Sequence, residues 1–181
     1  METISLLWQT LYIVAIIIFI YMSLWFVLAL VIKRNDVADI AWGLGFILAS
    51  LTALLIRGLD FDRSFFVTLL VTVWGLRLAM HIYERNKKRG EDERYLAWRN
   101  SWGKWFVLRS YLQIFLLQGV LLLLIVFPVL IINTYSATAL SLWDLLGLSV
   151  WFTGFFVEST ADAELGQFLS DPSNKGKRMT S

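Results

Sequence analysis

Three pairs of ionisable residues lie within or at the end of apolar stretches, where a charge is costly and usually marks a buried ion pair or a function. The two members of each pair are three or four residues apart, so on a helix both side chains occupy one face. Such a face could bind a polar group inside an apolar bundle. The pairs are Asp36 with Asp39, Arg77 with His81, and Glu158 with Asp162.

The first pair opens the stretch Asp36-Val-Ala-Asp39-Ile-Ala-Trp42-Gly43. Asp36 stands where a helix would begin, and we expect its side chain to cap the helix N-terminus, a role for which aspartate is well suited. Asp39 lies nearly one turn further into the apolar stretch, where capping cannot explain it. We therefore expect Asp39 to brace a polar cavity.

The second pair follows Trp74-Gly75 in an equally apolar stretch. Arginine stays charged in proteins, so Arg77 must reach the membrane edge or meet an anion. His81 is the only histidine of the chain, and a lone histidine on a helix is more often a structural hydrogen-bond partner than a base. Together with Asp39, these two residues are the candidate catalytic set, which would orient a polar group of a substrate or cofactor.

The third pair, Glu158 and Asp162, brings two carboxylates to one helix face, where they repel unless a cation or hydrogen-bond donors offset them. In one interpretation Arg77 or other basic residues pair with them. In the other they line a polar pocket and accept hydrogen bonds from the hydroxyl or amide groups of a ligand. Both interpretations stay open at this stage.

Composition defines the setting of these residues. The chain has 181 residues, of which 58% are hydrophobic and 17% charged, whereas soluble domains average about 45–50% and about 25%. Two prolines and no cysteine exclude a collagen-like fibre and a disulfide-bonded secreted module. The formal net charge of +2 is too small to suggest a nucleic-acid partner. The composition predicts an integral membrane protein in contact with membrane lipid. A hydrophobic small molecule that reaches the chain from the bilayer is the other expected partner.

Continuous apolar runs without period-2 alternation predict membrane-spanning helices. We expect an all-α bundle that forms a single transmembrane domain over residues 1–181, with a cytosolic loop at 85–105 and a cytosolic tail at 158–181. The last span should continue as a helix into the tail. The five predicted spans cover about residues 6–32, 37–56, 65–83, 111–132 and 140–157.

Lysine and arginine concentrate after the first, third and fifth spans, which places the N-terminus outside and the C-terminus in the cytosol. With this orientation, all three charged pairs fall in the cytosolic part of the bundle. We infer one polar cavity that opens to the cytosol and is covered by the 85–105 loop. The host membrane would be a bacterial inner membrane or the endoplasmic reticulum.

Within the loop, aromatic residues recur at spacings of three, four and three. This pattern predicts an amphipathic helix at the membrane surface, although a solvated charged segment with scattered interfacial aromatics fits as well. Because the chain has no cysteine and one histidine, we expect no metal site. The aromatic residues are Tyr95, Trp98, Trp102 and Trp105.

Five motifs in register carry a resemblance to a known group. From residue 36 to the end, the chain resembles a membrane family of unknown function that is related to steroid 5-alpha reductases; sterol reductases and isoprenylcysteine carboxyl methyltransferases belong to the wider group. The motifs are Asp36-Val-Ala-Asp39-Ile-Ala-Trp42-Gly43, Trp74-Gly75-Leu76-Arg77-Leu78 with His81, Gly90-Glu91-Asp92-Glu93-Arg94-Tyr95, Gln118, and Glu158-Ser-Thr-Ala-Asp162 ahead of Phe168 and Pro172.

The resemblance implies the first part of a bundle of about seven spans, with NADPH bound at a cytosol-facing cavity. The cofactor would reduce a carbon–carbon double bond conjugated to a carbonyl in a lipid-soluble substrate. Glu158 and Asp162 match the polar pair of the family before the cofactor loop, and Arg77 and His81 match its third-span motif. With Glu158 and Asp162, the residues expected to bind the cofactor are Arg85 and Asn86.

The family usually continues beyond a Lys-Gly-Lys stretch, here at residues 175–177, into a His-Pro-Asn-Tyr motif and two further spans. This sequence ends at Ser181, so we expect a truncated or fragmentary member with an incomplete cofactor site. Two alternatives stay open: a membrane methyltransferase that uses S-adenosylmethionine, and an inactive membrane fragment.

Overall fold

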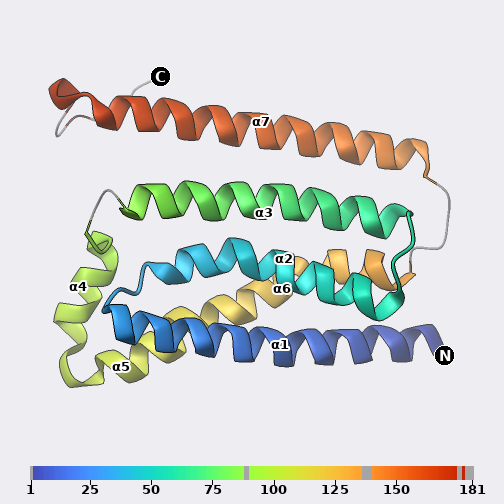
Figure 1. Cartoon of the computed structure of the whole chain (residues 1–181), viewed down its shortest axis with the longest axis horizontal. Helices are drawn as coiled ribbons and strands as arrows, with labels where there is room; N and C mark the ends of the chain where they lie inside the picture. Colours follow the sequence, from blue (N-terminus) through green and yellow to red (C-terminus); the bar gives the residue numbers. More distant parts are fainter. Residues whose placement is uncertain (1, 88–89, 136–139, 175–176, 178–181) are drawn as a thin grey trace. The chain divides into compact units, whose positions relative to one another are not determined.

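The computed structural model describes residues 2–87, 90–135, 140–174 and 177, and this part of the chain is helical and without strands (Figure 1). A 3-10 turn, η1 (Gly103–Trp105), a π-helical segment, η2 (Ser110–Leu116), and a last 3-10 turn, η3 (Pro172–Asn174), supplement the α-helices. The α-helices are α1 (Glu2–Ile32), α2 (Val37–Arg57), α3 (Arg63–Lys87), α4 (Glu93–Trp102), α5 (Phe106–Arg109), α6 (Leu117–Tyr135) and α7 (Leu142–Ser170).

The chain divides into two compact units, Met1–Ala139 and Leu140–Ser181. In the first unit, α1, α2, α3 and the continuous helical stretch Glu93–Tyr135 are each long and apolar enough to cross a membrane. The expected all-helical membrane bundle is therefore confirmed for these four elements.

The fifth predicted span lies in α7, the helix of the second unit. As expected, this helix continues without interruption into the predicted tail and ends at Ser170. Asp144 and Glu158 limit its uncharged stretch to 13 residues, which is roughly 20 Å of helix against a hydrocarbon core of about 30 Å. The structure does not place α7 among the helices apolar enough to span, and a fifth crossing stays a prediction.

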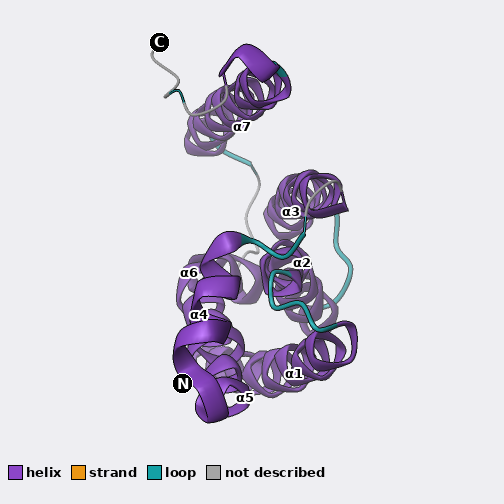
Figure 2. Ribbon diagram, turned by 90° about the vertical axis from the view of Figure 1, so that its left-hand side faces the viewer, coloured by secondary structure: helices purple, strands orange, loops and turns teal. Residues whose placement is uncertain are grey.

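In the first unit α2 is the central helix, since it packs against α1, α3 and α6 (Figure 2). Its crossing with α3 is a contact between backbones at Gly43 and Gly75. A Cβ atom at Gly43 would lie 2.8 Å from the carbonyl oxygen of Gly75, and one at Gly75 would lie 2.7 Å from the carbonyl oxygen of Gly43. The two Trp-Gly motifs thus supply the small residues that such close helix packing requires.

One end of this unit, here called the basic end, contains the α1–α2 turn, the end of α3, and α4; it is the end predicted to face the cytosol. At this end α1 stops at Lys33, which has a φ of +58°. The N–H of Arg34 donates to the carbonyl of Ala29 at 3.0 Å. This hydrogen bond closes the helix in the manner of a Schellman motif, in which a left-handed residue usually ends the last turn.

The loop predicted at 85–105 is largely helical, because α3 extends to Lys87 and α4 begins at Glu93. The expected helix with an aromatic face is present in α4, where the rings of Trp98 and Trp102 stack at 5.5 Å between centroids. The next ring in this row is Phe106, 6.3 Å from Trp102, rather than the predicted Trp105. The helix breaks at Gly103, whose φ is +48°, and the break changes the spacing.

Candidate functional site

Asp39 lies in the first turn of α2, and its carboxylate is met by side chains from α3, α4 and α6. The hydroxyl of Tyr95 donates to Oδ1 at 2.6 Å, and Nη2 of Arg94 approaches Oδ2 at 3.4 Å. Arg85 lies farther away, with Nη2 4.0 Å from Oδ2. The side chain of Asp39 is only 16% exposed. A carboxylate at this depth is stable because hydrogen-bond donors and cations surround it.

Gln118 reaches the same carboxylate from α6. Its Nε2 lies 3.5 Å from Oδ1 of Asp39, whereas its Oε1 is buried and accepts no hydrogen bond within the described part of the chain. Gln118 is the second residue after the π-helical segment Ser110–Leu116. π-Helical turns are rare and occur frequently at functional sites. The π-helical segment, called the wide turn below, therefore makes the start of α6, where Gln118 lies, a candidate part of the site.

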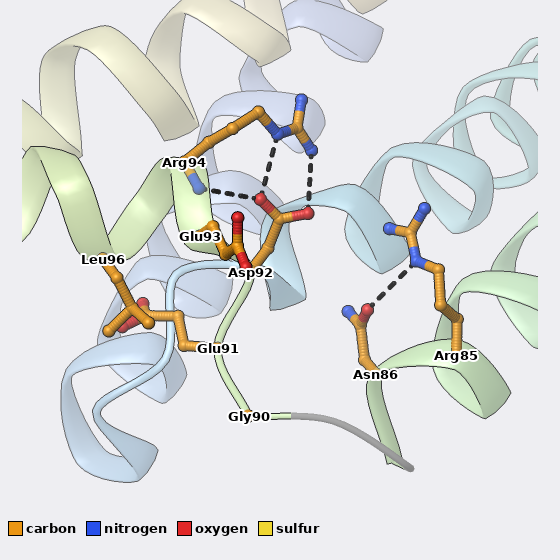
Figure 3. A pocket seen from close by; sticks show the side chains of 8 residues that line it. All are labelled: Arg85, Asn86, Gly90, Glu91, Asp92, Glu93, Arg94 and Leu96. Carbon is orange, nitrogen blue, oxygen red and sulfur yellow. Dashed lines mark hydrogen bonds and ion pairs between the residues drawn. The ribbon is translucent and has the colours of Figure 1, made fainter. Parts of the chain in front are cut away.

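A pocket with a volume of about 760 Å³ opens at the basic end, beside the arginines that face Asp39 (Figure 3). In Figure 3 the Arg94 side chain lies against Asp92, and Arg85 lies beside Asn86 on α3. The hydrogen bond from Arg94 holds the pKa of Asp92 below its ordinary value. The lining residues are Arg85, Asn86, Gly90, Glu91, Asp92, Glu93, Arg94 and Leu96.

Asp36 does not cap α2 through its side chain, although it occupies the N-cap position. Its carboxylate instead accepts two hydrogen bonds from Arg34, at 3.1 Å from Nε and 2.6 Å from Nη2. Because Asp36 is nearly fully buried, this bidentate pair satisfies a charge that would otherwise be costly. The prediction of a side-chain cap was wrong, because Arg34 offers stronger donors than the backbone of α2.

The same arginine joins the α1–α2 turn to the end of α3. Arg34 Nη2 also donates to the carbonyls of Asn86, at 3.1 Å, and Gly90, at 3.2 Å. In return, Nδ2 of Asn86 donates to the backbone carbonyl of Asp36 at 3.3 Å. These bonds hold one wall of the pocket against the bundle.

Glu91 forms a second junction at the α1–α2 turn. Its carboxylate accepts the N–H of Asn35 at 2.6 Å and two hydrogen bonds from Arg99, at 2.9 and 3.1 Å. Arg99 also donates to the carbonyl of Lys33 at 3.0 Å. The Glu91 side chain is 5% exposed. This junction fixes α4 on the bundle and thereby holds Tyr95 on Asp39.

The structure brings three of the predicted site residues together. Asp39 lies beside the pocket, and Arg85 and Asn86, both expected to bind a cofactor, line it. Arg77 and His81 lie on α3 eight and four residues before Arg85, on the same helix face, and Nε and Nη2 of Arg77 are buried. Their catalytic role stays a prediction.

Glu158 and Asp162 lie on one face of α7 in the second unit. The inferred single cavity that would unite all three charged pairs therefore stays a prediction. In the described part of the chain, no group of three or more histidine, cysteine, aspartate or glutamate residues is placed to hold a metal ion.

Residues of α4 and of the segment 90–92 before it contribute more to this site than the sequence indicated. Tyr95 was expected on a membrane-surface face, but it is buried against Asp39. Glu91, Arg94 and Gln118 were expected only as parts of the motifs that carry the resemblance, with no role of their own in a site. A usable signal existed in the stretch Gly90-Glu91-Asp92-Glu93-Arg94-Tyr95, where three carboxylates and an arginine directly precede a tyrosine.

The fold and this site define a helical membrane protein with a charged pocket at one end of its bundle. The chain belongs to the family described as "Protein of unknown function (DUF1295)", whose model matches residues 25–181. No curated protein and no solved structure matches the chain.

Proposed function

We propose that the chain is a membrane oxidoreductase of the kind related to steroid 5-alpha reductases, which uses NADPH to reduce a conjugated carbon–carbon double bond in a lipid-soluble substrate. The observation that carries the proposal is the pocket at the basic end, directly beside the buried pair Asp39–Tyr95. A water-soluble cofactor and a membrane-soluble substrate could meet only at such a border between charged and apolar surroundings.

The arginines of the pocket fit the anionic part of this cofactor. The side chains of Arg85 and Arg94 are 39% and 63% exposed, and guanidinium groups bind phosphate oxygens with two parallel hydrogen bonds. The carboxylates of Glu91 and Asp92 already accept hydrogen bonds from Arg99 and Arg94, which reduces their repulsion of a phosphate. When bound, NADPH would supply the hydride.

The residues of the chain would act on the carbonyl of the substrate. Negative charge develops on its oxygen during reduction of a conjugated double bond, and a fixed hydrogen-bond donor there lowers the barrier. The hydroxyl of Tyr95 carries a single proton, which it donates to Asp39 at 2.6 Å. To polarise the substrate, Tyr95 would exchange this acceptor for the carbonyl oxygen, and Asp39 would keep Arg94 and Gln118 as donors. We assign Tyr95 to this exchange, Asp39 to position the Tyr95 hydroxyl before the substrate binds, and Arg77 or His81 to orient a polar group.

One observation favours a second candidate function. Three consecutive carboxylates, those of Glu91, Asp92 and Glu93, line the same pocket. Carboxylates suit the cationic sulfonium and the ribose hydroxyls of S-adenosylmethionine better than they suit phosphates. A membrane methyltransferase is therefore the alternative to a reductase.

Thermal unfolding of the full chain in detergent, with NADPH or with S-adenosylmethionine added, separates the two. A ligand that binds only the folded protein raises its Tm. We expect NADPH to raise the Tm, Arg85→Gln to weaken this response about tenfold in NADPH concentration, and Lys104→Gln, outside the pocket, to leave it unchanged. A response to S-adenosylmethionine alone would favour the methyltransferase, and a response to neither would overturn both proposals in favour of a non-catalytic chain.

A further inference from the structure

The bend between α4 and α5 presents aromatic, apolar and cationic groups side by side. Gly103 turns the chain, and Trp105, which follows it, is 55% exposed. Nζ of Lys104 lies 5.8 Å from the centroid of the Trp105 ring. Arg109 is one helical turn after Trp105, so its side chain shares that face of the helix. We call Lys104, Trp105 and Arg109 the bend cluster.

The cations of this cluster differ from the other arginines at the basic end. Arg34, Arg94 and Arg99 each form an ion pair with a carboxylate. Within the part of the chain that the structure describes, Lys104 and Arg109 have no carboxylate within 4.0 Å, and both are exposed. Their charge is thus available to an external anion.

The position of the bend cluster along the chain indicates the kind of anion. Arg109 is followed by a continuous helix whose residues 111–132 contain no charged side chain, a length of about 33 Å that matches the hydrocarbon core. The cluster therefore lies where that helix would leave the core. Tryptophan and basic residues at this depth meet the headgroups of lipids. The neighbouring Val107 and Leu108, 51% and 49% exposed, suit the acyl-chain side of this border.

We propose that the bend cluster binds the phosphate of an anionic phospholipid, with Lys104 and Arg109 as the charged contacts and the indole of Trp105 as the interfacial anchor. This site lies outside the pocket lining and does not depend on the proposed reductase activity.

Binding of fluorescent phosphatidylglycerol to the full chain in mixed micelles tests the proposal, with unlabelled phosphatidylglycerol or phosphatidylcholine as competitor. We expect phosphatidylglycerol to compete at least tenfold better. The Lys104→Gln/Arg109→Gln variant should lose about tenfold or more in affinity, since each basic residue near an anionic surface contributes roughly fivefold. The charge-conserving Lys104→Arg/Arg109→Lys variant should keep it.

Lys87→Gln is the matched control, because Lys87 is also exposed at the basic end but lies outside the bend cluster. Equal competition by phosphatidylcholine would overturn the proposal, as would equal losses in the control and the double variant. Inorganic phosphate that displaces the lipid at matched ionic strength would assign the site to free phosphate instead. The Tm of each variant shows whether it folds, and a double variant that folds and binds normally would refute the proposal.

Discussion

The two ends of the first unit stabilise their buried polar groups in different ways. At the basic end, ion pairs such as Arg34–Asp36 and Glu91–Arg99 surround an open pocket. At the opposite end, neutral groups form the contacts deep in the bundle: Asn133, which is fully buried, donates through Nδ2 to the carbonyl of Ser50 and to Oγ1 of Thr68, each at 3.0 Å.

This difference indicates where a ligand can enter. Charged groups around a pocket can exchange partners with a charged ligand, whereas small neutral groups in close contact join helices without offering space. The opposite end does contain an ion pair, Arg57–Asp62, but both residues lie at the α2–α3 turn rather than between the helices. This comparison favours the basic end as the side on which a ligand would bind, and the opposite end as a contact that joins the helices.

The largest expected effect concerns the Gly43–Gly75 contact, on which both ends depend. Gly75→Val should destabilise the unit by about 3 kcal/mol or more, because its side chain would push α2 and α3 apart where a Cβ atom already lies 2.7 Å from a backbone oxygen. Tm in detergent measures the effect. Gly147→Ala on α7, where nothing lies within 4 Å of an added Cβ, should change little. Equal Tm values for both variants would show that the contact does not limit stability.

The next effect belongs to the basic end. Glu91→Ala should cost about 2–3 kcal/mol, since it leaves the guanidinium of Arg99 and the N–H of Asn35 without their acceptor. Faster hydrogen exchange in residues 93–102 should accompany the loss, because α4 would detach. Glu93→Gln changes an exposed carboxylate at the first residue of α4 and should change the free energy of unfolding by no more than about 0.5 kcal/mol. Unchanged exchange in Glu91→Ala would contradict the role of Glu91 in holding α4.

A smaller effect is expected at the opposite end. Asn133→Ala removes the two hydrogen bonds to Ser50 and Thr68 and should destabilise the unit by about 1–2 kcal/mol. Because we expect no ligand to bind at this end, NADPH should raise the Tm of the variant by as much as it raises the Tm of the parent chain, when each is compared with its own Tm without NADPH. If the Asn133→Ala protein folds but NADPH no longer raises its Tm, the proposed difference between the two ends is contradicted. Asn100→Ala, on an exposed position of α4, serves as the control.

The smallest effect is a dependence of stability on pH at the pocket. The hydrogen bond from Arg94 lowers the pKa of Asp92, so this carboxylate stabilises the folded state above its unfolded pKa of about 3.9. The stabilisation is lost as pH falls below that value and through the lowered folded pKa. Unfolding measured between pH 3 and 6 should show a shallower loss of stability in Asp92→Asn than in the parent chain. Parallel curves would exclude this contribution.

The helices were largely predictable, because their apolar runs set their lengths. The second predicted span, 37–56, differs from Val37–Arg57 by one residue, and the third, 65–83, is extended at both ends to Arg63–Lys87. The extension beyond Tyr83 consists of three charged residues and Asn86, which form a helix but are not apolar. Hydropathy alone therefore placed the span and missed the end of the helix.

The site was predictable only in part. The cost of burying a charge pointed to Asp39, but its partner Tyr95 is 56 residues away, and no local pattern encodes that contact. The capping preference of aspartate at a helix start favoured the wrong partner for Asp36, because the bidentate bond from Arg34 depends on how α1 ends at Lys33. These contacts arise from packing between different elements, and the spacing of residues along one helix carries no information about that packing.

The wide turn Ser110–Leu116 holds one more residue in each hydrogen-bonded turn than an α-helix does. Deleting one residue here, such as the exposed Leu112, would therefore let the segment tighten into a regular α-helix that covers nearly the same rotation, and the aromatic bend and Gln118 would keep their registration. The same deletion within the regular part of α6 would turn the two flanking parts by about 100° against each other, so the chain should tolerate a shorter length at this one segment and not in the helix that follows.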